Sequence, residues 1–385
     1  MNLLKIALEA PHYILYTIIG LAGIGFLIGI HELGHFLFAK LFKVRTPSFS
    51  IGFGPQLISR KIGDTLFSLS AIPLGGYVEV SGMGEIGQGE QKEAQNTGAD
   101  SFGAKRFYQK MLILFGGILN NLLFAYLSLI LLFIIGAPKT ELLNPLGITI
   151  YKPVIQAIAK DSPAEHAGLK AGQEITKINN IAINGDAKLL AETIKAHPGE
   201  SVTLTVQEPE SATGTAQDIQ ITLGSREITE NGITKHIGIW GALLEIDRIP
   251  TYSFGQAVMQ GIHATNTYIY TTMLAFKNMF IKRDIAGVGG PIMIIKETIK
   301  GAQKGFKIFL LFLAIISINL AVLNLIPLPI LDGGQIMFVT IEAILGKQLP
   351  KLREYIHIIS WVLILALFVY LTIRDLGIIQ WFNLG

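Results

Sequence analysis

The chain of 385 residues contains no cysteine, which excludes disulfides, thiolate nucleophiles and zinc sites built on cysteine. Charged residues are also scarce, at 15% of the total, whereas soluble globular proteins carry about 25%. The net charge is only +3, so the composition gives no support to nucleic-acid binding. Half of the residues are hydrophobic. Together these features indicate an integral membrane protein.

Four apolar stretches are long enough to cross a membrane, whose hydrocarbon core is spanned by about 20 apolar residues. They are residues 13–39, 111–135, 306–331 and 356–373. Between the first two, strand-like runs at 56–61 and 65–71 flank Gly63-Asp64, which predicts a β-hairpin that could offer an edge strand to an unwound substrate. We therefore expect a polytopic α-helical membrane protein with four transmembrane helices, a membrane-associated β-hairpin and an inserted α+β domain between the second and third spans.

The chain can be divided on this basis into seven parts. They are the first helix, 1–40; a cytoplasmic or membrane re-entrant hairpin region, 41–110; the second helix, 111–136; a periplasmic domain, 140–245; an amphipathic membrane-associated segment, 250–305; the third helix, 306–335; and the fourth helix, 355–374.

The second half of the first span contains the motif His31-Glu32-Leu33-Gly34-His35. On a helix, His31 and His35 lie on one face, so both imidazoles could bind one zinc ion. Glu32 lies beside them and could act as general base on water at the metal. A catalytic zinc would still need a third protein ligand and an open position. The alternative is a pair of interfacial histidines with Glu32 in an ion pair, but ionisable groups inside a span usually mark function.

The third span ends in a second polar motif, Asn-Leu-Ile-Pro-Leu-Pro-Ile-Leu-Asp-Gly-Gly, at residues 324–334. Pro327 and Pro329 interrupt the helix, and broken backbone at membrane depth is tolerated where protein or a cavity surrounds it. Asp332 follows this apolar run and is the candidate third ligand. Taken alone, Asp332 would be better interpreted as the cap of a helix over 335–345. In combination with the histidine motif, zinc ligation is favoured.

These two motifs together resemble the site-2 protease family, peptidase family M50, and within it the type of the bacterial regulator of sigma-E protease. The resemblance covers most of the chain outside 140–245 and includes the runs 49–54, 72–77 and 287–291. It implies an intramembrane zinc metalloendopeptidase with one Zn²⁺ held by His31, His35 and Asp332, and with Glu32 as the catalytic residue. It also implies that three residues hold the substrate near the metal: Asn324, Pro327 and Pro329.

Three features depart from the family pattern. Many relatives have Gly-Pro where this chain has Gly116-Gly117, although Asn120 is retained, and Gln335 replaces a residue that is often histidine. Neither change falls on a ligand, so we expect both to leave the zinc site untouched. The third departure is that the insert has room for a single PDZ domain, where a well-known relative has two in tandem.

The insert itself looks like a PDZ domain of the bacterial protease type at residues 162–179, and a helix at 187–195 and a closing strand at 236–239 fit this pattern. PDZ domains capture chain ends by adding a strand to a sheet edge. Ile237, Gly238 and Ile239 could form the edge that binds a terminal carboxylate. The alternative is a domain that only blocks access to the site sterically, and both roles stay open.

Lysine and arginine near the span ends predict the orientation, because short cytoplasmic loops carry an excess of both. The tails have few, Lys5 at the N-terminus and Arg374 at the C-terminus. Many more lie between spans one and two and after span three: Lys40, Lys43, Arg45, Arg60, Lys61, Lys92, Lys105, Arg106, Lys110, Lys347, Lys351 and Arg353. We expect a multi-pass protein of the bacterial inner (cytoplasmic) membrane, with both termini and the PDZ domain periplasmic and the active site near the cytoplasmic side.

The resemblance further implies regulated intramembrane proteolysis in a sigma-E stress response. Expected partners are membrane lipid and the transmembrane segments of single-span substrates, namely anti-sigma factors first cut by an upstream site-1 protease and remnant signal peptides; no nucleic acid is expected. One competing function is a zinc transporter, which would need a polar path where spans two and four offer only Asn120 and Asn121. Another is an inactive PDZ scaffold in the membrane, which would not need a complete zinc site.

Overall fold

The computed structural model of the protein describes residues 3–83, 93, 96–148, 151–183, 187–207, 216–230, 233–246, 252–282, 289–347 and 349–376. Gly287 and Val288, which begin one of the family-like runs, lie outside these residues. The chain forms two compact units. We call them the membrane unit, comprising Met1–Ile135, Tyr252–Lys277 and Ile285–Gly385, and the insert, comprising Gly136–Thr251 with Asn278–Asp284.

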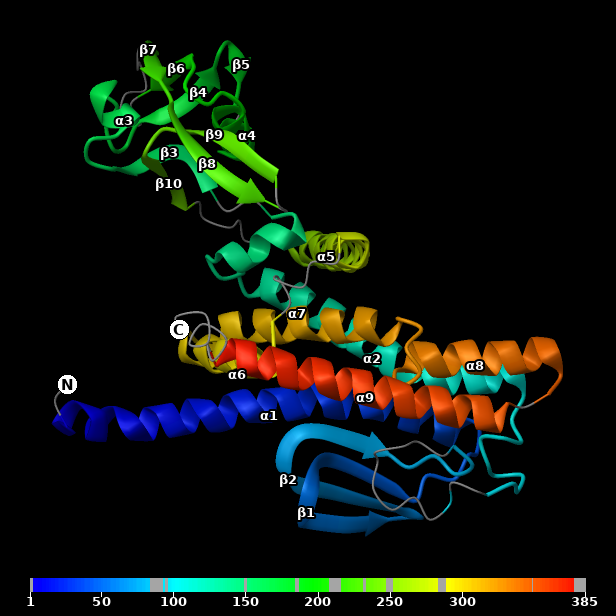
Figure 1. The fold of residues 1–385 in the computed structure, drawn as a ribbon. Coiled ribbons are helices and arrows are strands. Elements are labelled where there is room, and N and C mark those ends of the chain that lie inside the picture. The colour runs from blue at the N-terminus through cyan, green and yellow to red at the C-terminus, as the bar shows by residue number, and fades with distance from the viewer. Residues whose placement is uncertain are drawn as a thin grey trace, which may run out of the picture. The chain divides into compact units, whose positions relative to one another are not determined.

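Four helices of the membrane unit are long and apolar enough to span a membrane (Figure 1). They are His12–Leu41 within α1 (Leu3–Leu41), α2 (Phe107–Ile134), α7 (Phe306–Asn324) and Lys351–Asp375 within α9 (Pro350–Asp375). The predicted number of spans is thus confirmed. Outward-facing Leu123 and Leu127 are more than half exposed, as expected for side chains that contact lipid tails instead of water.

The third span is shorter than predicted. Helix α7 ends at Asn324, and α8 (Asp332–Leu345) begins only at Asp332. The predicted boundary of 306–335 is therefore wrong, because Pro327 and Pro329 lack the N–H groups that would continue the helix. The non-helical residues between the two helices bring the start of α8 against α2.

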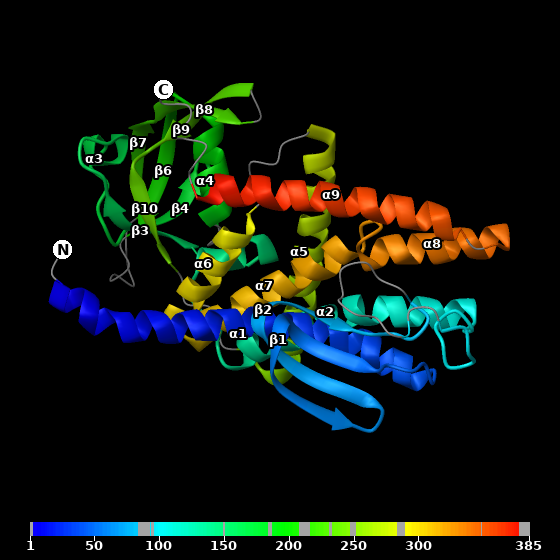
Figure 2. The ribbon, with the colours of Figure 1, turned by 60° about the horizontal axis from the view of Figure 1, so that its bottom comes forward.

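The hairpin consists of β1 (Ser48–Ile62) and β2 (Thr65–Val78), which pair from Ile62 and Thr65 onward around a turn in which Gly63 has φ 59°. The pairing is irregular, and Ile51 of β1 has a partner on each side, Leu69 and Gly76. The end of β2 is consequently an outer edge of the sheet. Strand β2 packs beside α1 (Figure 2).

The segment expected to be one amphipathic region, 250–305, forms two helices, α5 (Phe254–Lys282) and α6 (Pro291–Gln303). In the membrane unit α5 runs across the direction of the spans (Figures 1 and 2), as expected for a helix that lies along a membrane surface. Helix α6 packs on α1, α7 and α9. Its first turn is capped from α9, since the N–H of Met293 donates to Asp375 Oδ2 over 2.9 Å.

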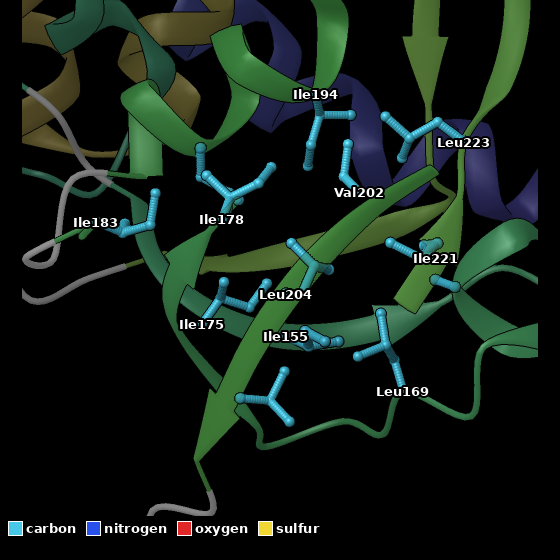
Figure 3. Close-up of a cluster of buried hydrophobic side chains, with 13 residues drawn as sticks. Ile155, Leu169, Ile175, Ile178, Ile183, Ile194, Val202, Leu204, Ile221 and Leu223 are labelled. Carbon is cyan, nitrogen blue, oxygen red and sulfur yellow. The ribbon is translucent and has the colours of Figure 1, made fainter. Parts of the chain in front are cut away.

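The insert is built on a sheet with strand order β10-β3-β4-β6-β7, to which β5 adds beside β4. The strands are β3 (Tyr151–Ile158), β4 (Glu174–Ile178), β5 (Ile181–Ala182), β6 (Ser201–Gln207), β7 (Gln217–Thr222) and β10 (Ala242–Ile246). A separate hairpin pairs β8 (Gly224–Glu230) with β9 (Ile233–Ile239), and the helices are η1 (Glu141–Leu146), α3 (Pro163–His166) and α4 (Ala187–Ala196). Aliphatic side chains from the sheet and α4 form one core (Figure 3).

Candidate active site

The site is built where α1 and α2 touch through glycine. A Cβ on Gly116 would lie 2.5 Å from the carbonyl oxygen of Gly34, and a Cβ on Gly34 would run into the carbonyl of Gly116. Contacts this close need residues without side chains, which is how small residues bring membrane helices together. At Gly34 of the histidine motif, the backbone of α1 therefore contacts the backbone of α2 directly.

Gly117 provides the surface on which both histidine rings rest. A Cβ at this position would lie 2.5 Å from His31 Cε1 and closer still to His35 Nε2. Real Cβ atoms do not approach other atoms so closely, so alanine here would displace the rings. The expectation that the Gly116-Gly117 departure leaves the zinc site untouched stays a prediction, and the structure adds that Gly117 lies directly against both rings.

His31, His35 and Asp332 converge on one point, and their ligand atoms all lie within 4.8 Å of one another. The two Nε2 atoms are 3.2 Å apart, and Asp332 Oδ2 lies 3.3 Å from His31 Nε2 and 3.5 Å from His35 Nε2. A tetrahedral zinc with bonds of about 2.0–2.1 Å would separate its ligand atoms by about 3.3–3.4 Å. The spacing of these three atoms thus matches that of three corners of a zinc site.

Asp332 Oδ2 is buried and has no hydrogen-bond partner among the residues that the structure describes. A buried carboxylate oxygen left in this way is costly unless something else satisfies it, and a cation between it and the two imidazoles would do so. Asp332 occupies the first position of α8, whose N-cap, Leu331, makes no side-chain capping bond. The carboxylate faces the histidines, and no capping bond from it is found within the described part of α8.

The Nδ1 atom of each histidine ring has a hydrogen-bond partner on α2. His35 Nδ1 lies 2.8 Å from the backbone oxygen of Ile113, and His31 Nδ1 lies 3.2 Å from the side-chain amide of Asn121. Such partners fix the orientation of histidines that bind metals. Neither Ile113 nor Asn121 was singled out as a partner from the sequence. A polar residue inside span two was the one available signal for Asn121.

Glu32 is oriented by the hairpin. Its Oε2 accepts a hydrogen bond of 3.0 Å from the backbone N–H of Val78, at the outer edge of β2. Alternate N–H groups of an edge strand point away from the sheet and are free to bind other groups. The contact leaves Oε1 of Glu32 available to water. No sequence signal marks Val78, because its contribution comes from the backbone.

A cavity of about 150 Å³ opens at this point. It is lined by His31, Glu32, His35, Val78, Val80, Met83, Ile113, Asn324, Ile330, Leu331 and Asp332. A water molecule occupies about 30 Å³ in the liquid, so the cavity accommodates water beside Glu32. The structure thus brings together four predicted residues, the two histidines, Glu32 and Asp332, and adds Asn324 to the cavity wall.

The other predicted binding residues lie elsewhere. Pro327 is exposed and Pro329 is buried, with its carbonyl accepting a hydrogen bond of 3.3 Å from Gln335 Nε2; neither contributes to the described cavity wall. Ile237, Gly238 and Ile239 belong to β9 of the insert and pair with residues of β8. The other side of Gly238 packs against the carbonyl of Ile194 in α4. One edge of β9 is therefore paired with β8 and the face at Gly238 is covered by α4, while no strand pairs with the second edge of β9 among the described residues.

Comparison with known proteins agrees with this geometry. Residues 19–368 match the family described as Peptidase family M50. A protein of Clostridium perfringens, named as a candidate zinc metalloprotease, is 31% identical over 371 residues, covering 94% of this chain and 98% of the relative. The zinc metalloproteases RasP of Oceanobacillus iheyensis and Geobacillus kaustophilus are 27% and 28% identical, over 91% of this chain and 96% and 95% of those relatives. The chain belongs to peptidase family M50, the site-2 proteases, and is a zinc metalloprotease of the membrane.

Proposed function

We propose that the protein is an intramembrane zinc metalloendopeptidase that cuts the transmembrane segments of single-span membrane proteins. The observation that carries this proposal is the spacing of His31 Nε2, His35 Nε2 and Asp332 Oδ2, 3.2–3.5 Å apart, on and beside a helix that can span a membrane. These three residues would hold the zinc ion. When bound, zinc would supply a Lewis acid that activates water and polarises a scissile carbonyl.

Glu32 would perform the proton transfers. With Oε2 fixed by Val78, its other oxygen faces the cavity and can take the proton from the attacking water. The same carboxyl group would then give the proton to the leaving amine, so that Glu32 acts first as general base and later as general acid. Asn324, on the cavity wall, can donate to or accept from the substrate backbone.

The substrate has to unwind before it can react, because a transmembrane helix satisfies its own backbone hydrogen bonds. An edge strand beside the site can replace these bonds by pairing with the unwound segment. Within the hairpin, the edge that reaches Glu32 is the end of β2 near Val78 rather than residues 56–71. We therefore assign the pairing to this end of β2.

The decisive experiment compares purified wild-type enzyme with Glu32→Gln, using a tagged transmembrane peptide as substrate. The variant is expected to keep one zinc ion per chain and to lose cleavage, because glutamine cannot accept the proton. Glu297→Gln is the matched control: Glu297 is paired with Lys300 on α6, and this variant should cleave like wild type. Cleavage by Glu32→Gln would overturn the assignment.

The proposed orientation places both termini and the insert in the periplasm and the site near the cytoplasm. The lysines and arginines between spans one and two support it. Because the chain has no cysteine, single cysteines give an unambiguous test. A cysteine at exposed Glu165 of the insert should react with a membrane-impermeant maleimide added outside. A cysteine at exposed Ser59 of β1 should react only after the membrane is opened; the reverse pattern would contradict the orientation.

The insert is proposed to be a single PDZ domain that excludes uncut proteins with bulky outer domains. Steric exclusion is favoured over capture of a chain end because α4 packs directly against Gly238, in the strand that would have to bind the chain end. The substrates would be anti-sigma factors already shortened by an upstream site-1 protease, and remnant signal peptides. Removal of residues 140–245 should allow cleavage of an intact substrate, and unchanged selectivity would argue against exclusion.

Zinc transport is the competing function, since it would also use histidine and aspartate inside spans. It predicts zinc flux into proteoliposomes that contain the purified protein, together with an unaffected flux in Glu32→Gln. The proposed protease predicts no flux above that of empty vesicles and peptide cleavage that depends on Glu32.

A further inference from the structure

The two histidines of the site differ in what faces their second ring nitrogen. His35 Nδ1 lies 2.8 Å from the backbone oxygen of Ile113. A carbonyl oxygen can only accept, so His35 Nδ1 carries the proton and Nε2 keeps its lone pair for a metal. His31 Nδ1 faces a side-chain amide instead, that of Asn121, at 3.2 Å. An amide can present either a donor or an acceptor, so its orientation decides which nitrogen of His31 is protonated.

Asn121 is fully buried, and within the described residues its Oδ1 has no hydrogen-bond partner. With Nδ2 donating to His31 Nδ1, the ring proton would sit on His31 Nε2, the atom that faces Asp332 Oδ2 at 3.3 Å. That proton would compete with a metal ion. Rotating the amide by half a turn exchanges two groups of nearly the same size. Asn121 Oδ1 then accepts a hydrogen bond from His31 Nδ1, and His31 Nε2 is left unprotonated.

We propose that Asn121 is a positioning residue whose Oδ1 accepts a hydrogen bond from His31 Nδ1 and thereby fixes the ring form in which Nε2 binds zinc. The inference rests on the proposed zinc site of His31, His35 and Asp332. Helix α2 then supplies a hydrogen-bond acceptor to each histidine, a backbone carbonyl at Ile113 and a side-chain oxygen at Asn121. Asn121 makes this contact across 90 residues of sequence, which is why no local motif contains it.

The test compares zinc binding by the full chain with that of three variants. Asn121→Leu keeps most of the side-chain volume but cannot accept a hydrogen bond. Asn121→Asp keeps an acceptor of the same shape and lacks the amide N–H. Asn120→Leu is the matched control, because Asn120 immediately precedes Asn121 on the same helix and its side chain donates to the backbone oxygen of Ile30 over 3.1 Å. Zinc affinity is measured by competition with a chromophoric chelator, and site geometry by the visible spectrum of the Co²⁺-loaded protein.

Asn121→Leu is expected to bind zinc about 10- to 100-fold more weakly, the usual cost of losing such a partner, and to change the Co²⁺ spectrum. Asn121→Asp and Asn120→Leu should bind zinc and Co²⁺ like wild type. The inference is overturned if Asn121→Leu binds like wild type, if Asn121→Asp loses affinity, or if Asn120→Leu loses as much as Asn121→Leu. Should Asn121→Leu not fold, the Asp variant decides. Wild-type protein that binds no zinc would instead refute the proposed function.

Discussion

The insert and the membrane unit are held together by different kinds of contact. The insert buries a cluster of 13 hydrophobic residues, most of them from its sheet and α4 (Figure 3), as a water-soluble domain does. Around the proposed metal site, by contrast, the membrane unit buries glycines and polar side chains, such as Gly117, His35 and Asn121, beside hydrophobic residues such as Ile113 and Leu114. Lipid tails are as apolar as leucine, so close backbone approach and hydrogen bonds also help to hold these helices together.

This difference predicts that the insert loses the most stability when buried methylene groups are removed. Leu204 of β6 is fully buried in the core, and Leu204→Ala should lower the free energy of unfolding of the insert by about 2–5 kcal/mol. Hydrogen exchange of insert peptides in the intact protein measures the effect, and zinc affinity should not change. Ile181→Ala is the control, because Ile181 is 50% exposed in β5. A comparable loss in both variants would show that the cluster is not the main source of stability.

The membrane unit should be most sensitive to added atoms. Gly117→Ala would push the His31 and His35 rings out of place, and a displacement of about 1 Å costs about 100-fold in catalysis, or about 2.7 kcal/mol. Peptide cleavage and zinc affinity should both fall. The matched variant is Gly255→Ala on α5, where no atom lies within 4 Å of the added methyl group. Equal activity of the two variants would contradict a tight fit at Gly117.

Single hydrogen bonds between membrane helices should have the smallest effect. Thr272 on α5 donates to Asn319 Oδ1 on α7 over 3.3 Å, and Thr272→Val keeps its shape without the hydroxyl. We expect the unfolding free energy in detergent to fall by about 0.6 kcal/mol. Among the described residues, the Thr271 hydroxyl donates to the backbone of its own helix, at Thr267, so Thr271→Val should change the unfolding free energy less. A loss of several kcal/mol at Thr272 would mean that polar contacts carry more of the stability than inferred.

What the sequence predicted well was local. The spans follow from runs of apolar residues, and His31 and His35 share a helix face because they are four residues apart. Asp332 could be predicted as a ligand because an acidic residue at the end of a span is unusual. The end of α7 at Asn324 was missed, although the two prolines that cause it were recognised.

What the sequence could not predict depends on contacts between distant segments. Ile113 and Asn121 meet the histidines across 78 and 90 residues, and Val78 meets Glu32 across 46. Two of these three partners use backbone atoms, which every residue has and no pattern can mark. Gly117 was noticed only as a departure from relatives, and its role emerged when α1 and α2 were placed in contact.

The hydrogen bond from Val78 to Glu32 bears on how this enzyme can diverge. Its donor is a peptide N–H, so nineteen of the twenty amino acids supply it, and only proline at position 78 removes it. Glu32, the proposed general base, is thus oriented by the strand register and not by the identity of a residue. The sequence of the hairpin can drift, or be redesigned for other substrates, while the Glu32 carboxylate keeps its alignment.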